Sequence, residues 1–202
     1  MKSIKTLGAA AMAGIALTAI IAAGTAQATV LGSGETLLTA GTTITATLSG
    51  SATLTTTEGT VLDTCTGGEV KGKTTNAGGA AETVKGTVEK TGLTWTRCTE
   101  PTSTLAGGSL EIHHITGTTN GTLTGSGFEV TVNTTIFGSC IFTLGAGTTL
   151  GTLTGSTSGN ATMDINAVAT RKSGLCPSSA KWVGTYTVTG PSPLKVEGQN
   201  WL

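Results

Sequence analysis

Short alternating segments separated by glycine-rich turns fill the chain from residue 29 onward, and they restrict the possible folds more than any other feature. Polar and apolar residues alternate at Thr43–Leu48 and Phe128–Asn133, and in part at Val84–Val88 and Val183–Val188. A period of two places successive side chains on opposite faces of a strand. No segment after residue 28 sustains the period of about 3.6 residues that marks a helix. The pattern predicts an all-β fold.

The composition points the same way, because 46 of the 202 residues are threonine and 31 are glycine. Threonine is β-branched and favours strands, whereas glycine pairs such as Gly67-Gly68, Gly78-Gly79 and Gly107-Gly108 favour turns. We expect about ten short strands in an antiparallel β-sandwich or a partly closed β-barrel. They would form a single domain over residues 29–202, in which 29–59 could be a separable N-terminal strand segment.

The first 28 residues have the pattern of a secretory signal peptide. Two lysines precede a largely apolar run from Leu7 to Ala23, and Ala26-Gln27-Ala28 matches a small-x-small cleavage site. We expect residues 1–28 to be removed by cleavage after Ala28. An uncleaved membrane anchor is the alternative, since the run approaches the ~18 residues that span a bilayer. The mature chain, with no transmembrane segment expected, is predicted to be secreted, either extracellular or at the cell surface.

Four cysteines, Cys65, Cys98, Cys140 and Cys176, follow the predicted cleavage site, and none forms a C-x-x-C pair. In an exported chain an even set of this kind predicts disulfide bonds and disfavours a zinc site. Four cysteines allow three connectivities. The interval from Cys65 to Cys98 nearly equals that from Cys140 to Cys176, and both enclose similar material rich in glycine and threonine. We therefore expect these two pairs, each stabilising the fold by about 3 to 4 kcal/mol on the loop-entropy model.

Charged residues are scarce, at 11% of the chain, with 11 basic against 11 acidic side chains. Nucleic-acid binding requires a basic surface that neutralises phosphates, and a formal net charge of zero provides none. Acid, base and metal chemistry also has few groups to draw on, because the chain contains only two histidines. The composition excludes a nucleic-acid partner and disfavours an enzyme.

The candidate chemical groups are weak one by one. His113 and His114 are adjacent, so on a strand they point to opposite faces and cannot hold one metal ion together. Glu111 and His113 share a face, but no third ligand is near in sequence, and His114 should lie on the inner face. Asp63 and Asp164 could pair as general acid and base, yet no activating groups flank them. We therefore assign no catalytic, cofactor-binding or metal residues and expect no cofactor.

Two of the three tryptophans lie within predicted strands and admit two roles. Trp95 and Trp182 could be flat platforms for a ligand. In a chain with 3% aromatic residues they are expected instead to anchor the core. Trp201 could be exposed or could dock on the sheet. The scarcity of aromatic residues also disfavours an outer-membrane barrel, which carries aromatic girdles at both interfaces.

Several short motifs resemble those of small exported bacterial proteins. They are Cys65, the block Gly92–Thr96, the stretch Val132–Thr134 with Phe137–Cys140, then Cys176 and the closing segment Pro191–Val196. Together they are similar to the Thr/Gly-rich exported proteins of actinobacterial type and, more distantly, to the protein activator of alkane oxidation family. That resemblance covers residues 60 to 197. It implies a surface or extracellular-matrix protein, linked in the distant family to biofilm and to growth on hydrophobic substrates.

The leading functional hypothesis is a secreted, non-enzymatic surface or matrix protein with an adhesive, biofilm or envelope-associated role. Its partners would be further copies of itself or components of the cell envelope. Residues Thr42–Thr57 carry no charge and favour strands, so they are the segment expected to pair with another chain. The alternative hypothesis is a secreted binding module for glycans or small apolar ligands, built on Trp95 or Trp182.

Overall fold

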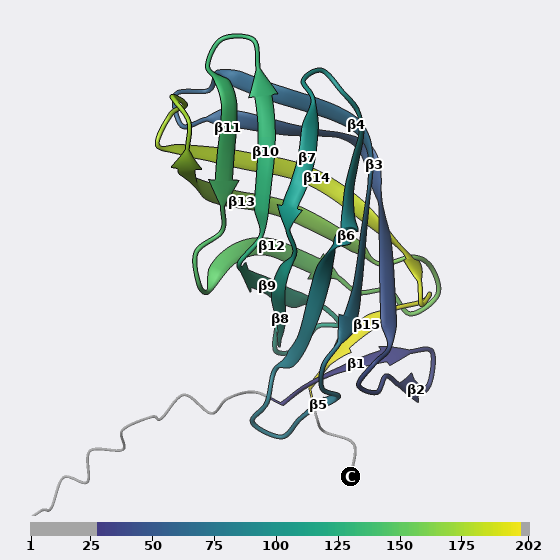
Figure 1. The fold of residues 1–202 in the computed structure, drawn as a ribbon. Coiled ribbons are helices and arrows are strands. Elements are labelled where there is room, and N and C mark those ends of the chain that lie inside the picture. The colour runs from purple at the N-terminus through teal and green to yellow at the C-terminus, as the bar shows by residue number, and fades with distance from the viewer. Residues whose placement is uncertain (1–27, 199–202) are drawn as a thin grey trace, which may run out of the picture.

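The computed structural model describes residues 28–198, which form fifteen β-strands and no helix, so none of these residues belongs to a membrane-spanning helix (Figure 1). The predicted signal peptide up to residue 27 and Trp201 lie outside the described residues. The strands are β1 (Thr29–Ser33), β2 (Thr36–Leu37), β3 (Thr43–Thr56), β4 (Val61–Thr74), β5 (Gly78–Gly79), β6 (Val84–Cys98), β7 (Thr102–Ala106), β8 (Gly108–His114), β9 (Gly121–Ser126), β10 (Glu129–Thr134), β11 (Gly138–Thr143), β12 (Thr148–Thr154), β13 (Thr162–Ser173), β14 (Ser179–Gly190) and β15 (Lys195–Glu197).

The main sheet closes into an antiparallel barrel with eight strand positions. Five positions are the long single strands β3, β4, β6, β13 and β14. The other three are strands broken near their middle, namely β7 with β8, β9 with β10 and β11 with β12. Each position pairs with its neighbour in the chain, and β14 pairs with β3 to complete the circuit. The barrel therefore runs up and down around its wall in sequence order.

The broken strands bend where glycine lets two backbones come close. Gly107 separates β7 from β8, and a Cβ atom there would lie 2.0 Å from the carbonyl oxygen of Val88 on β6. Only a residue without a side chain fits this crossing. The pairing register still continues through the bend, because Ala106 faces Glu129 and Ser109 faces Ser126. The halves β7 and β8 are thus one bent barrel strand.

The all-β prediction is confirmed, and of the two arrangements left open by the sequence the structure adopts the barrel. Several strands are longer than expected, since β3, β4 and β6 span 14 or 15 residues. The segment Thr42–Thr57, predicted to pair with another chain, contains β3, which pairs with β14 on one edge and β4 on the other. That strand is an integral part of the barrel wall and offers no free edge.

A smaller sheet of β1, β2, β5 and β15 lies across one end of the barrel (Figure 1). Its central pair joins the two ends of the described chain, with Leu31 opposite Val196. Both side chains are almost fully buried, and they pack in the same cluster as Leu123 and Leu153 of the barrel. The small sheet therefore closes this end with apolar side chains.

Both predicted disulfide pairs are confirmed. Cys65 and Cys98 face each other directly in the ladder between β4 and β6. Cys140 on β11 is joined to Cys176 in the connection between β13 and β14. Two disulfides fit an extracellular location.

Candidate functional site

The barrel interior contains a partly open cavity of about 130 Å³ whose wall is almost entirely apolar. Eighteen residues line it: Leu54, Val70, Leu93, Trp95, Leu110, Leu123, Phe128, Val130, Phe142, Thr143, Leu144, Leu150, Met163, Ile165, Ala167, Ala169, Trp182 and Tyr186. No charged side chain is among these described residues. Because successive strand residues alternate between faces, the apolar half of each strand points inward and meets the others at this space.

The two tryptophans predicted as platforms or anchors meet inside the barrel. Trp95 comes from β6 and Trp182 from β14, yet their ring centroids are only 4.4 Å apart with an interplanar angle of 65°. This edge-to-face contact is a favoured arrangement of aromatic rings. Both rings line the cavity and are half-buried. They therefore pack inside the barrel, as expected of core anchors, and the ligand-contact role stays a prediction for the same two residues.

Small residues on β13 leave the space that the tryptophans border. Ala167 lies opposite Trp182 in the ladder between β13 and β14, and Ala169 follows it on the same inner face. Val168, between them, points outward and is 48% exposed. A larger inward residue on β13 would fill the cavity, so these alanines keep it open.

Tyr186 brings the only phenol of the chain to the cavity. It lies on β14 and is 1% exposed. Burial raises the pKa of its hydroxyl to about 12, while the interaction with the Trp182 side chain opposes that shift. The hydroxyl is therefore protonated at neutral pH. The partial alternation over Val183–Val188 puts Tyr186 and Val188 on one face of a strand, but the sequence indicated no role for Tyr186.

Where the second half of β6 runs beside β7, side-chain hydrogen bonds connect the two strands in place of backbone pairing. The first half of β6, Val84–Val88, forms a ladder of backbone hydrogen bonds with β8. The second half, Leu93–Cys98, forms no such ladder with β7. We call this stretch the seam. Thr104 of β7 bridges it, because its hydroxyl donates to the Leu93 carbonyl oxygen at 2.7 Å and accepts from Trp95 Nε1 at 3.1 Å. The seam thus lies directly beside the tryptophan pair.

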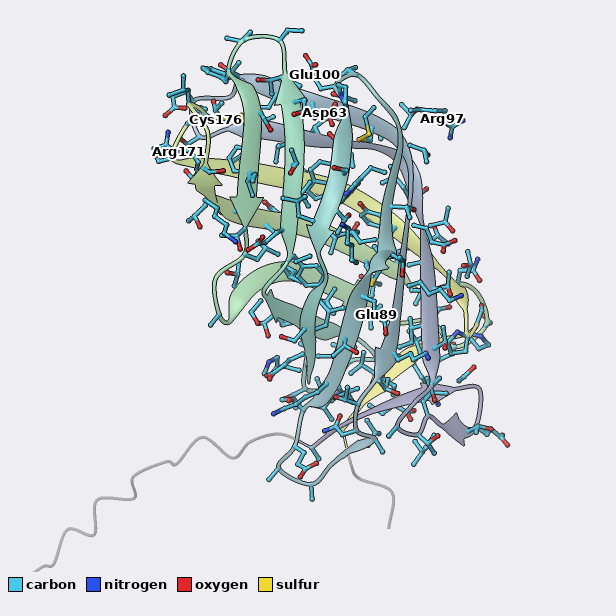
Figure 2. All side chains as sticks on the ribbon, viewed as in Figure 1. Asp63, Glu89, Arg97, Glu100, Arg171 and Cys176 are labelled. Atoms are coloured by element: carbon cyan, nitrogen blue, oxygen red, sulfur yellow. A yellow bond between two sulfur atoms is a disulfide. The ribbon has the colours of Figure 1, made fainter. Side chains whose placement is uncertain are left out.

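The two aspartates considered as an acid and base pair lie apart. Asp63 is on β4 and Asp164 on β13, with β3 and β14 between them in the wall. Asp164 is exposed and accepts a hydrogen bond from Thr185. Asp63 is 1% exposed and lies at the same end of the barrel as Glu100 (Figure 2). Different surroundings and separate strands rule out a shared reaction centre.

Asp63 instead holds the turn between β6 and β7. Its Oδ1 accepts from the backbone N–H groups of Thr64 and Glu100, at 2.7 and 3.0 Å, and from the Thr99 hydroxyl at 2.9 Å. Its Oδ2 accepts from the Thr102 hydroxyl at 2.5 Å. Four donors around one buried carboxylate fix the turn over the end of β4. The sequence does not reveal this structural role, because three of the four donors come from a turn far along the chain.

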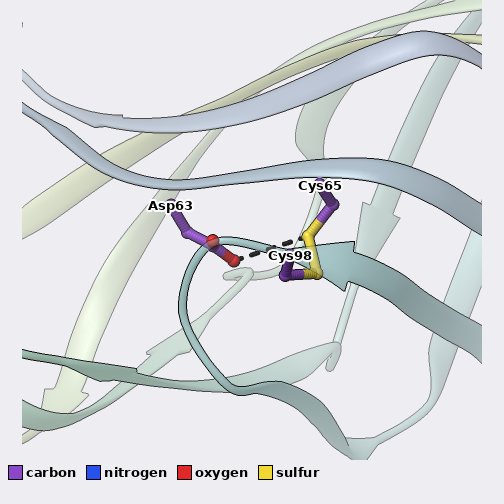
Figure 3. A group of neighbouring side chains, drawn as sticks. All are labelled: Asp63, Cys65 and Cys98. Carbon is purple, nitrogen blue, oxygen red and sulfur yellow. Dashed lines mark hydrogen bonds between the residues drawn. A yellow bond between two sulfur atoms is a disulfide. The ribbon is translucent and has the colours of Figure 1, made fainter.

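Asp63 also lies next to the first disulfide, with Oδ2 3.4 Å from Cys65 Sγ (Figure 3). Asp63, Cys65 and Cys98 are the described residues whose metal-type donor atoms come within 4.8 Å of one another. Both sulfur atoms are bonded to each other, however, so neither is available as a thiolate ligand. A single carboxylate with four hydrogen bonds does not make a metal site.

The histidines lie near the opposite end, on β8. Glu111 and His113 share a face as predicted, with His113 Nε2 3.8 Å from Glu111 Oε2, and Lys85 is 3.7 Å from the other carboxylate oxygen. The His114 ring hydrogen-bonds the Thr118 carbonyl oxygen. These contacts are those of a polar surface at the end of a strand.

Fold and site together define an up-and-down β-barrel with an apolar internal cavity. The chain matches no family model, no curated protein and no solved structure.

Proposed function

We propose that this protein is a secreted, non-enzymatic binding protein that holds a small apolar molecule inside its barrel. The observation that carries the proposal is the apolar cavity bordered by Trp95 and Trp182. An eight-stranded barrel is just wide enough to be filled by side chains or to hold one small ligand. Here the side chains leave part of the interior unfilled.

The size of the space indicates the size of the ligand. A dry apolar cavity of about 150 Å³ in a protein core takes up benzene, and the cavity here measures about 130 Å³. A molecule with one ring and a short substituent fits that volume. Glycans, the other ligand class of the sequence-based alternative, need several polar partners for their hydroxyls, and this wall provides too few.

Filling the cavity is expected to abolish binding. The probe is α-methylstyrene, an uncharged molecule with one ring and a short substituent. In the variant Ala167→Leu, the added carbon atoms occupy the space beside Trp182. The affinity for the probe should therefore fall at least about tenfold. Titration calorimetry measures this affinity, and the tryptophan fluorescence should change on binding to the wild-type protein.

The matched control is Val168→Leu on the same strand, because Val168 points outward. Its affinity should stay within about twofold of wild type, since exposed substitutions rarely disturb the interior. If neither α-methylstyrene nor another neutral one-ring molecule of that size binds the wild-type protein, or if both variants bind α-methylstyrene equally well, the proposed function is wrong.

The surface or matrix role favoured by the sequence is a second proposal, and exposed apolar side chains at one barrel end support it. Val61, Ile136 and Leu175 are 56%, 73% and 87% exposed. They lie at or in the connections β3–β4, β10–β11 and β13–β14, which an up-and-down topology brings to the same end. With so few charges to repel it, a second copy of the chain is the partner we propose for this end.

Replacing all three residues by threonine should prevent self-association. Sedimentation velocity is expected to show concentration-dependent association of the wild-type protein and a monomer for Val61→Thr, Ile136→Thr, Leu175→Thr. The control variant Leu37→Thr, Val168→Thr, Val183→Thr changes three apolar residues that are 39% to 50% exposed, and it should associate like wild type. A wild-type protein that stays monomeric at high concentration contradicts this second proposal.

A further inference from the structure

The cavity contains one polar feature that an entirely apolar ligand would leave unused. Tyr186 is buried, and its phenol borders the cavity. A phenol can donate one hydrogen bond and can also accept, whereas an indole N–H can only donate. Trp182 therefore donates to the Tyr186 oxygen, and the Tyr186 O–H stays free to donate to another group. Among residues 28–198 the structure shows no hydrogen bond that this O–H donates, because the interaction with Trp182 uses the Tyr186 oxygen as an acceptor. Tyr186 lines the cavity, so the cavity is the space from which an acceptor can reach the hydroxyl.

A buried donor without an acceptor is costly, and a ligand can supply what is lacking. Water is a poor substitute, because it needs two to four polar partners. The wall offers few, since the Trp95 N–H is already bonded to Thr104. An acceptor atom on the ligand satisfies the Tyr186 hydroxyl while the rest of the molecule stays against apolar side chains.

The lining also limits the charge of the ligand. None of the described residues lining the cavity is cationic or anionic. A carboxylate or an ammonium group would lose its hydration without gaining a partner of opposite charge. A tyrosine hydroxyl is protonated at neutral pH, and burial moves the pKa of Tyr186 further from neutrality, so this group acts as a hydrogen-bond donor and supplies no negative charge.

We infer that the ligand is a neutral apolar molecule with a single acceptor oxygen, such as an aromatic ketone, aldehyde or ester, whose oxygen accepts a hydrogen bond from Tyr186. This inference rests on the proposed binding function and names the ligand class for that same cavity. Trp95 and Trp182 then contact the apolar part of the ligand, and Tyr186 sets its orientation.

Three probes with the same number of non-hydrogen atoms test the inference, namely acetophenone, α-methylstyrene and benzoate. The first has a carbonyl where the second has a carbon–carbon double bond, and the third is charged at neutral pH. Titration calorimetry with wild-type protein should show acetophenone binding at least about tenfold more tightly than benzoate. In Tyr186→Phe, the affinity for acetophenone should fall about tenfold, while that for α-methylstyrene should stay within about twofold.

Binding of α-methylstyrene by Tyr186→Phe shows that the variant is folded and the cavity intact. If Tyr186→Phe weakens both neutral probes equally or neither of them, or if benzoate binds as tightly as acetophenone, the ligand class is wrong. The proposed function would still stand in those cases, provided that α-methylstyrene binds and Ala167→Leu abolishes its binding. If no probe binds the wild-type protein, both fail.

Discussion

Replacing Asp63 by alanine is expected to lower the free energy of unfolding by about 3 kcal/mol or more. The substitution leaves the N–H groups of Thr64 and Glu100 and the hydroxyls of Thr99 and Thr102 without their buried acceptor. A buried donor left without a partner costs about 1 to 3 kcal/mol. Two of the donors keep a second acceptor, since the Thr64 N–H also donates to Thr99 Oγ1 at 3.1 Å and the Thr102 hydroxyl to the Glu100 carbonyl oxygen at 3.3 Å, so the loss is smaller than the sum over four donors. Urea denaturation followed by tryptophan fluorescence measures the loss.

Two further variants separate the buried network from the mere loss of a carboxylate. Asp164→Ala removes an exposed aspartate with one hydrogen bond from Thr185, so the loss should be under about 1 kcal/mol. Asp63→Asn keeps an acceptor at the Oδ1 position, where three of the four donors converge, and should lie between wild type and Asp63→Ala. Equal losses for Asp63→Ala and Asp164→Ala would contradict the role assigned to Asp63.

Removing either disulfide should cost about 3 to 4 kcal/mol, because the loop-entropy model depends on the length of chain that each bond closes. The two sequence separations are 33 and 36 residues, so the paired variants Cys65→Ala, Cys98→Ala and Cys140→Ala, Cys176→Ala should lose similar amounts. Denaturation of each variant beside the oxidised wild-type protein provides the measurement.

The surroundings of the two bonds make this comparison informative. Cys65 and Cys98 already face each other in a ladder, whereas Cys140 is tied to a connection outside its own ladder. If each disulfide stabilises the protein mainly by restricting the unfolded chain, the different surroundings of the two bonds do not change the loss of stability. A loss below about 1 kcal/mol for the ladder pair, with a large loss for the other, would show that native contacts outweigh the entropy of the unfolded chain.

The Cys65–Cys98 disulfide, Asp63 and the seam form one structural unit beside the cavity. The turn that Asp63 holds leads from β6 into β7, and those two strands border the seam that Thr104 bridges. Cys98 ends β6 immediately before that turn. Trp95, whose Nε1 donates to the Thr104 hydroxyl across the seam, lies on the cavity wall next to this unit.

How far the sequence predicts the site depends on the kind of information each residue carries. The pairing of Cys65 with Cys98 followed from the spacing of four cysteines, since few connectivities compete. The tryptophans stood out because aromatic residues are rare in this chain. Asp63 did not stand out, because three of its four donors reach it only once the turn at residues 99–102 folds back over β4.

The sequence by itself determined that the chain is all-β and which side chains share a face of each strand, and the cysteine spacing favoured the two pairs that form. The first two properties are local, because the two-residue period of a strand is written in consecutive residues. Only the tertiary structure decided that β14 pairs with β3 and closes the wall, so that the segment Thr42–Thr57 loses its free edges. Closure depends on pairing between strands far apart in the chain, which alternation does not encode. The cavity has the same origin, since Ala167, Trp95 and Tyr186 come from separate strands and share one space only inside a closed barrel.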